Sequence, residues 1–194
     1  MHLLARSRSL RLYSLGAVSL SVWLTLVVSA VACAQRDATV SASHSPAQLG
    51  INHRTSCTVT HVSDGDSIVC APLGRVRLLL IDSPEMSDRE LGREARQALI
   101  GIMPVGTKVT AETDVRVTDQ FGRVLAYLFL PDGEMINERM AESGYATTLV
   151  YPPNVKYVER IRAAVKNARI EKRGLWAIGG FDCSPRDYRA GRCR

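Results

Sequence analysis

The chain has 194 residues, 46% of them hydrophobic, which is enough for one ordinary domain with a buried core and some additional segments. The formal net charge is +6, from 25 basic and 19 acidic residues. The part expected to fold offers no histidine pair, no Ser-His-Asp arrangement and no C-x-x-C pair, which argues against histidine-assisted nucleophilic catalysis and against zinc.

The first 34 residues have the pattern of an export signal. A basic start with three arginines precedes an uncharged, largely apolar run over residues 12–34, which ends in Ala32-Cys33-Ala34. This pattern predicts a cleaved signal peptide. Two alternatives remain open: a lipoprotein leader that leaves Cys33 acylated, and an uncleaved membrane anchor. We therefore expect a secreted or cell-envelope protein, with membrane attachment through the N-terminus as one outcome.

Residues 35–55 are rich in serine, alanine and small polar residues without periodicity, so we predict a flexible linker. Alternating apolar and polar residues begin near residue 56. We assign residues 56–180 to the folded domain and residues 181–194 to a basic tail that contains cysteines.

The folded region predicts five strands and three helices. Two strands flank Asp64-Gly65, a signal for a tight hairpin in which glycine tolerates positive φ, and a third antiparallel strand follows. Ser87 and Glu90 resemble a capping box at the start of the first helix, and Asn154 is the expected cap of the long helix. The expected strands are 55–62, 67–73, 75–81, 107–115 and 123–130, and the expected helices are 87–103, 135–143 and 154–173. One helix after the third of five strands is typical of an OB-fold barrel, an α+β architecture.

The basic residues are concentrated near the C-terminus. Residues 35–154 hold 11 basic and 15 acidic residues, whereas residues 155–194 hold 11 basic and 4 acidic ones. An acidic middle beside a basic C-terminal region suits a metal site next to a surface that binds a polyanion. The alternative is that the basic residues only form the solvated face of the long helix.

The exported part retains four cysteines, which allow up to two disulfides with three connectivities. We prefer Cys57–Cys70 across the first hairpin with Cys183–Cys193 in the tail.

Two groups of acids stand at the ends of neighbouring strands. Asp66 follows the first hairpin turn, and Asp82 ends the third strand where Pro84 stops it. If these strands are neighbours, the two carboxylates converge and repel each other unless a cation lies between them. Oxygen ligands alone suit a hard cation such as Ca²⁺ or Mg²⁺. The alternative is that Asp64 and Asp66 are turn formers and Asp82 is a strand terminator.

Three further residues could take part in phosphodiester hydrolysis: two arginines that could bind phosphate and one acid that could activate water. Arg77 lies in an otherwise apolar strand, where its charge needs a partner: a phosphate, or an ion pair with Asp82 or Glu85. Glu85 is either a turn residue or a general base that holds a water molecule. Arg123 follows Gly122 at a strand start, where an arginine is usually only solvated.

Taken in order, short motifs of the chain resemble the staphylococcal nuclease (thermonuclease) family. The resemblance covers residues 56–178 and rests on Asp64-Gly65-Asp66-Ser67, Arg77 to Glu85, Gly92-Arg93-Glu94-Ala95, Asp119-Gln120-Phe121-Gly122-Arg123, Asn137-Glu138 and Gly174-Leu175-Trp176.

The resemblance implies an OB-fold barrel with three helices that hydrolyses DNA and RNA with Ca²⁺, and we expect a monomer. Asp66, Asp82 and the backbone carbonyl of Ser83 would hold Ca²⁺. Glu85 would orient or deprotonate water, and Arg77 and Arg123 would bind the phosphate and its developing charge.

Two departures from the family concern nucleotide binding. Phe121 replaces a tyrosine whose hydroxyl helps to bind a terminal phosphate, and Gln120 stands where lysine occurs.

We therefore predict an exported, calcium-dependent nuclease with little sequence specificity. The first alternative is a noncatalytic OB module that binds nucleic acid or a protein at the cell surface, with tyrosines near the basic helix as stacking platforms. The second is a stabilising calcium site in an envelope protein, which leaves Arg77 and Arg123 unexplained.

Overall fold

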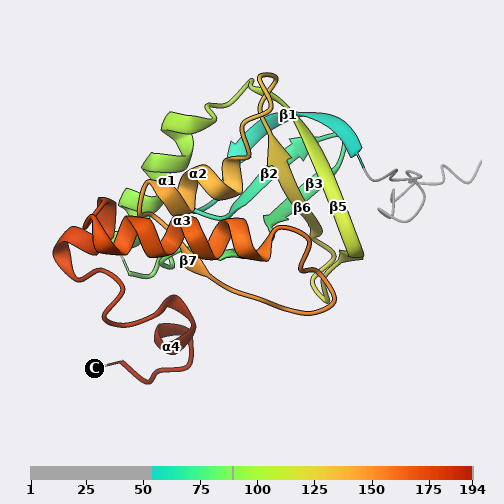
Figure 1. Cartoon of the computed structure of the whole chain (residues 1–194). Coiled ribbons are helices and arrows are strands. Elements are labelled where there is room, and N and C mark those ends of the chain that lie inside the picture. The colour runs from blue at the N-terminus through green and yellow to red at the C-terminus, as the bar shows by residue number, and fades with distance from the viewer. Residues whose placement is uncertain (1–53, 89, 194) are drawn as a thin grey trace, which may run out of the picture. The chain divides into compact units, whose positions relative to one another are not determined.

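Five strands close into a barrel in the computed structural model, which describes residues 54–88 and 90–193 (Figure 1). Neighbouring strands in the barrel follow the order β1-β2-β3-β6-β5. The strands are β1 (Arg54–Val62), β2 (Ser67–Ala71), β3 (Gly74–Leu78), β5 (Lys108–Thr118) and β6 (Val124–Phe129). The first three pair antiparallel as predicted, and β3 pairs parallel with β6 to complete the barrel. The α+β class and the five-stranded OB-type barrel are confirmed.

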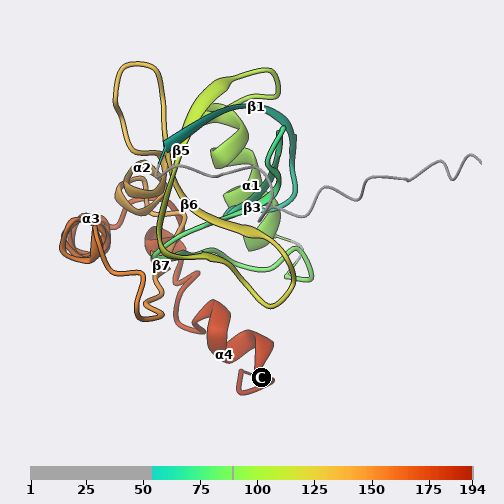
Figure 2. The same cartoon turned by 90° about the vertical axis from the view of Figure 1, so that its right-hand side faces the viewer.

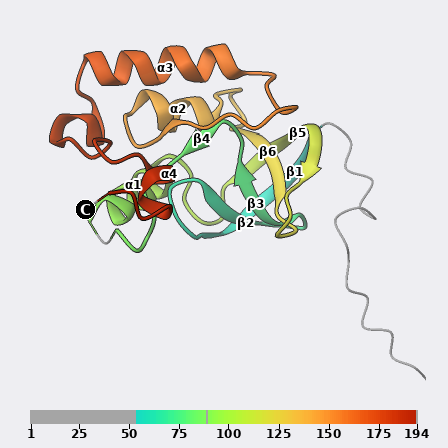
Figure 3. The ribbon, with the colours of Figure 1, turned by 90° about the horizontal axis from the view of Figure 1, so that it is seen from below.

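Three helices correspond to the predicted ones: α1 (Leu91–Ile102), α2 (Ile136–Glu142) and α3 (Val158–Ile170). Helices α2 and α3 pack against each other on one side of the barrel (Figure 3). The described part of the chain has a fourth helix, α4 (Pro185–Arg189), so the predicted count of three is wrong. Five residues are too few for a helical period to be visible in the sequence. No described helix is long and apolar enough to cross a bilayer.

The predicted leader, residues 1–34, lies outside the described residues, as does the predicted linker up to residue 53. Strand β1 begins at Arg54, so the last two residues assigned to the linker belong to the barrel.

The core follows from the alternation of the strands and from one face of each helix. In β1, Cys57, Val59 and Val62 are buried, while Thr58, Thr60 and His61 reach the surface. In α3, Ile161, Ala164 and Ala168 are buried. The basic residues of α3 lie on its exposed side, and Arg162 pairs there with Glu159 of the same helix.

The predicted strand 75–81 is wrong in its second half. Strand β3 ends at Leu78, and the chain turns at Leu79 and Leu80, where Leu80 has a positive φ of 65°. The next two residues form β4 (Ile81–Asp82), which pairs with β7 (Thr147–Thr148) outside the barrel. An unbroken run of apolar residues has no alternation to reveal this turn, because all of them are buried. Arg77 and Ile81 therefore belong to different strands, and Leu79 lies in the turn between them.

Two predicted helix caps are also wrong. Asn154 does not begin α3; its side-chain oxygen accepts a hydrogen bond from the Arg116 amide (2.7 Å), and its side-chain nitrogen donates to the Arg116 carbonyl (2.8 Å). The asparagine thus fastens the segment before α3 to β5. Helix α1 begins at Leu91, and Glu90 at its N-cap makes no side-chain capping bond.

Both preferred disulfides are present. Cys57–Cys70 joins β1 to β2, and Cys183–Cys193 closes a loop around α4.

Glu112 of β5 is a buried acid with three partners. It accepts hydrogen bonds from Arg54 (2.6 Å), Lys156 (2.5 Å) and Tyr157 (2.9 Å), so it links β1, β5 and the start of α3. Burial alone would raise the pKa of Glu112, but these donors outweigh burial and lower its pKa below the ordinary value of 4.5.

We expect Glu112→Gln to lower the free energy of unfolding by about 2 kcal/mol at neutral pH, because charge-assisted hydrogen bonds are lost. A lowered pKa in the folded state stabilises the fold above the ordinary pKa, and this contribution disappears as the pH falls through the folded-state value. Urea unfolding at neutral pH and at about pH 3 should therefore show the difference between variant and wild type shrinking with acid. Glu134→Gln, which removes an exposed acid paired with Arg139, is the control. A loss of equal size at both pH values would contradict this role of Glu112.

Candidate active site

The turn between β1 and β2 places Asp66 next to the segment that follows β4. The Asp64 carboxylate accepts a hydrogen bond from the Asp66 amide (2.9 Å), and Asp66 Oδ2 accepts one from the Ser83 amide (2.9 Å). A Cβ on Gly65 would lie 2.7 Å from the Ser83 Cβ and 2.8 Å from the Ala95 Cβ. The predicted hairpin between β1 and β2 is present, but glycine is required at position 65 by this close approach and not by a positive φ.

Arg77 of β3 joins the two predicted metal-binding carboxylates. Its Nη2 lies 3.0 Å from Asp66 Oδ2 and 3.2 Å from Asp82 Oδ1. Its Nη1 donates to the carbonyls of Leu78 (2.6 Å) and Ile81 (2.9 Å), which the turn after β3 directs back toward the guanidinium. The ion pair with Asp82, one of the two sequence-based alternatives for Arg77, is therefore present. The structure also brings Asp66 and Asp82 to the same nitrogen atom, so the two carboxylates converge.

Asp82 and Glu85 lie on either side of a buried segment. The Asp82 side chain is 1% exposed, and burial raises its pKa although Arg189 and Arg77 oppose this effect. Glu85 is half-buried, and its position depends on α1, because a Cβ on Gly92 would lie only 2.2 Å from the Glu85 carbonyl oxygen. This contact fixes the loop that presents Glu85.

Burial and the neighbouring charge of Asp66 raise the pKa of Asp64 to about 6. The acids at this turn are therefore held together at an electrostatic cost, which a cation would reduce.

Arg123 enters from the loop between β5 and β6. Asp119 organises this loop by accepting hydrogen bonds from the amides of Phe121 and Arg123, both at 2.9 Å, and from Arg123 Nε at 2.7 Å. The left-handed Gly122 (φ 72°) provides the turn between them. The guanidinium lies over the Phe121 ring, 5.6 Å from its centre. Arg123 is thus positioned by Asp119 and not by the acids around Arg77.

A cavity of about 520 Å³ connects these groups. Of the predicted residues, Asp66, Arg77, Glu85 and Arg123 line it, while Asp82 and Ser83 are buried beside it. The other lining residues include Arg116, Phe121, Tyr151, Asn154 and Arg189. Phe121 and Tyr151 are largely exposed, at 61% and 62% of the residue surface. The cavity therefore combines acids, guanidinium groups and two accessible aromatic rings.

The sequence did not predict Arg189, which belongs to α4. Its Nη2 lies 2.8 Å from Asp82 Oδ2, and its Nη1 lies 2.6 Å from Glu85 Oε1. The two cysteines of the tail predicted a closed loop around this arginine. Nothing in the sequence indicates that the loop packs against acids about a hundred residues earlier. Arg116 was also missed, because an exposed arginine in a strand has no distinguishing pattern.

The donor atoms near Arg77 are suited to a hard cation. They are the carboxylate oxygens of Asp66 and Asp82, and no sulfur or imidazole lies among the lining residues. Two guanidinium groups already lie against Asp82, which shows that this acid attracts positive charge. Within the described residues no group of three or more His, Cys, Asp or Glu is arranged to hold a metal ion.

The fold and the site together define an α+β protein with an OB-type barrel, in which acids and arginines gather in one cavity. The family model described as staphylococcal nuclease homologue matches residues 75–178. The chain belongs to this family, as the sequence motifs predicted.

Individual relatives agree with this assignment. A thermonuclease of Staphylococcus hyicus is 35% identical over 127 residues, which cover 61% of this chain and 74% of the relative. An uncharacterised protein of Bacillus anthracis is 38% identical, covering 63% of this chain and 61% of the relative. Endonuclease YncB of Bacillus subtilis is 31% identical, covering 64% and 63%. The tail around α4 lies beyond the residues that the family model matches.

Proposed function

We propose that this protein is an exported, calcium-dependent nuclease that hydrolyses phosphodiester bonds of DNA and RNA with little sequence specificity. The observation that supports this proposal most is the gathering of Asp66, Arg77 and Glu85 in one cavity with Arg123. The names of the relatives, thermonuclease and endonuclease, support the same reaction.

Asp66, Asp82 and the main-chain carbonyl of Ser83 would hold calcium. When bound, calcium would supply positive charge that polarises the phosphate and favours ionisation of a water molecule. The residues fit this role because both carboxylates are buried at one point, where a cation offsets their mutual repulsion.

Glu85 would accept the proton of the attacking water. It is half-buried at the edge of the cavity, and its carboxylate is reachable from the solvent. A well-placed general base contributes roughly 10²–10⁴-fold to the rate. Attack in line with the leaving oxygen then requires that the phosphate be fixed opposite this carboxylate.

Arg77 and Arg123 would bind the nonbridging phosphate oxygens. A planar guanidinium suits this task because it can donate two parallel hydrogen bonds. The terminal nitrogens of Arg77 already donate to two carbonyls and to Asp82, and Nη2 lies 3.0 Å from Asp66 Oδ2. Arg77 would therefore exchange a carboxylate contact for a phosphate oxygen. Arg123 would keep its Nε–Asp119 contact and present its terminal nitrogens.

Little sequence specificity follows if the protein holds its substrate by phosphate and by stacking. Phe121 and Tyr151 expose their rings in the cavity, and an aromatic face accepts any base. Phe121 has no hydroxyl and Gln120 has no charge, so binding of a terminal phosphate would be weaker than in relatives that carry tyrosine and lysine there.

The same two rings favour a second candidate, an OB module that binds single strands without cutting them. Such a module has no need for Glu85 or for a pair of converging aspartates, which is why we prefer hydrolysis.

The test uses purified residues 35–194 with supercoiled plasmid DNA and with single-stranded RNA in millimolar calcium. We expect both substrates to be shortened to small fragments. Retarded migration of intact nucleic acid would identify the binding module. Digestion of DNA alone would contradict the proposed lack of sugar preference.

A further inference from the structure

The C-terminal segment reaches into the candidate active site through one side chain. Arg189, the last residue of α4, forms ion pairs with both Asp82 and Glu85. Its Nη2 contacts both carboxylate oxygens of Asp82, at 3.1 Å and 2.8 Å, and its Nη1 contacts Glu85 Oε1 at 2.6 Å. One guanidinium thus engages a predicted metal ligand and the predicted general base at the same time.

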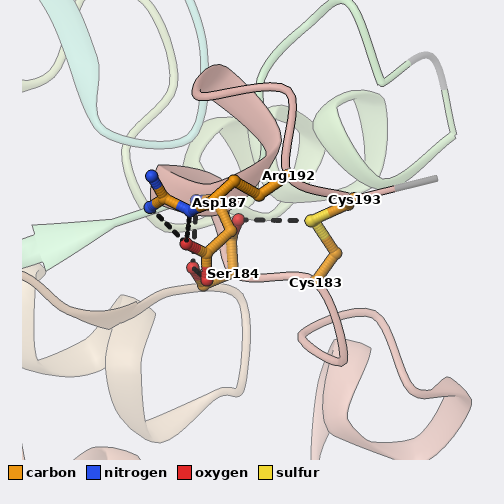
Figure 4. The surroundings of a disulfide bond; sticks show 5 residues. All are labelled: Cys183, Ser184, Asp187, Arg192 and Cys193. Atoms are coloured by element: carbon orange, nitrogen blue, oxygen red, sulfur yellow. Dashed lines mark hydrogen bonds and ion pairs between the residues drawn. A yellow bond between two sulfur atoms is a disulfide. The ribbon is translucent and has the colours of Figure 1, made fainter.

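A disulfide and a network of short contacts hold this segment in shape. Cys183–Cys193 closes the loop, and Ser184 caps α4 by accepting a hydrogen bond from the Asp187 amide at 3.1 Å. The Ser184 hydroxyl donates to the Asp187 carboxylate, which also pairs with Arg192 (Figure 4). A five-residue helix is not stable alone, so these constraints are what present Arg189 in a fixed direction. Figure 2 shows α4 beyond the barrel, close to the end of the chain.

Arg189 differs from Arg77 in how it reaches the acids. Arg77 arises from a barrel strand and its side chain is 13% exposed, whereas Arg189 approaches from the tail and its side chain is 38% exposed. The tail also lies outside residues 75–178, which match the family. Arg189 can therefore withdraw without disturbing the barrel, because only the tail loop has to move.

The contact has an electrostatic consequence for cations. A divalent ion at Asp82 needs the oxygen lone pairs that Arg189 Nη2 now occupies, and two positive groups a few ångströms apart repel each other strongly in a poorly solvated site. Glu85 is also engaged by Arg189, so the same side chain occupies a carboxylate oxygen of the proposed general base. Arg189 and a divalent ion therefore compete for the same acid.

We propose that the tail loop, residues 183–193, is an autoinhibitory element that uses Arg189 to raise the calcium concentration at which the site fills. This inference rests on the proposed function, since it names the regulation of that same site. At low calcium Arg189 neutralises Asp82 and Glu85; at high calcium the ion displaces it. The disulfide keeps the loop closed and so sustains the competition.

The test is a calorimetric titration of calcium into the exported chain, residues 35–194, in the absence of nucleic acid. Arg189→Gln should bind calcium about 10-fold more tightly, within the range of typical coupling between two sites. The double variant Cys183→Ser/Cys193→Ser should shift in the same direction by a smaller factor. Arg186→Gln, which removes an exposed charge from the same helix, is the matched control and should behave as the wild type.

Nuclease rates measured across calcium concentrations complete the test. Arg189→Gln should reach half of its maximal rate at about 10-fold lower calcium, with an unchanged rate at saturation. Unchanged calcium affinity, or absence of calcium binding in every variant, would overturn the inference. A lower rate at saturating calcium would also overturn it, because Arg189 would then serve substrate binding.

These outcomes separate the inference from the proposed function. Tighter calcium binding by Arg189→Gln in a protein that never cleaves nucleic acid would support the competition and refute the nuclease. If the wild type cleaves nucleic acid and Arg189→Gln binds calcium with the same affinity as the wild type, the nuclease is supported and the competition is refuted. Thermal unfolding of each variant shows that the barrel remains folded.

Discussion

Replacing Arg77 by lysine is expected to lower the rate of nucleic-acid cleavage by about 10³-fold. Lysine keeps the positive charge but loses the planar fork that binds two phosphate oxygens together. In this protein it also loses the bridge from one nitrogen to Asp66 and Asp82. The initial rate of plasmid cleavage at saturating calcium measures the effect.

The matched control is Arg75→Lys. Arg75 lies two residues earlier in β3, is exposed, and donates to the Phe121 carbonyl. It should retain activity within a few-fold of the wild type. Because Arg77 also donates to two carbonyls, its replacement should lower stability as well, so urea unfolding accompanies the assay. Near wild-type cleavage by a folded Arg77→Lys protein would remove Arg77 from the mechanism.

Replacing Glu85 by glutamine is expected to lower the rate by roughly 10²–10⁴-fold, because the amide cannot accept the proton of the attacking water. The fold should persist, since the side chain is 36% exposed and its ion pair with Arg189 joins it to the tail and not to the barrel. Calcium affinity should not fall, because Arg189 loses one of its two carboxylate partners and competes less well for Asp82.

Glu90→Gln provides the control for Glu85, as Glu90 is an exposed acid in the same region and makes no capping bond. A Glu85→Gln protein that cleaves at the wild-type rate would assign Glu85 to the structure of the turn and not to catalysis.

The fold was predictable wherever the sequence alternates. Polar and apolar residues alternate over much of β1 and β5, and the cysteines at positions 57 and 70 lie across one hairpin as expected. The turn at Leu79 and Leu80 was not predictable, because buried apolar residues occupy both the strand and the turn. Asn154 was assigned as a helix cap, but its side chain bonds the backbone of Arg116 in β5. The sequence cannot separate these two roles, because an asparagine side chain is suited to both.

The candidate site was predictable where its residues belong to neighbouring strands. Asp66 and Arg77 come together because the first three strands are consecutive and antiparallel. Asp82 reaches Arg77 from β4, after the turn that follows β3. Arg189 was not predictable, because its position depends on how a disulfide-closed tail packs against acids that are 104 and 107 residues away in sequence. The roles of the site residues in catalysis and in metal binding are predictions.

The calcium dependence of plasmid cleavage tests the central claim most directly. Residues 35–194 of the wild type are incubated with supercoiled plasmid in millimolar calcium, and in the same buffer with a calcium chelator in excess. We predict nicking and then degradation in calcium, and intact plasmid in the chelator. Without calcium, Asp66 and Asp82 would hold no cation to polarise the phosphate and to favour ionisation of the attacking water. Equal degradation in both buffers would contradict the account, as would an intact plasmid in both.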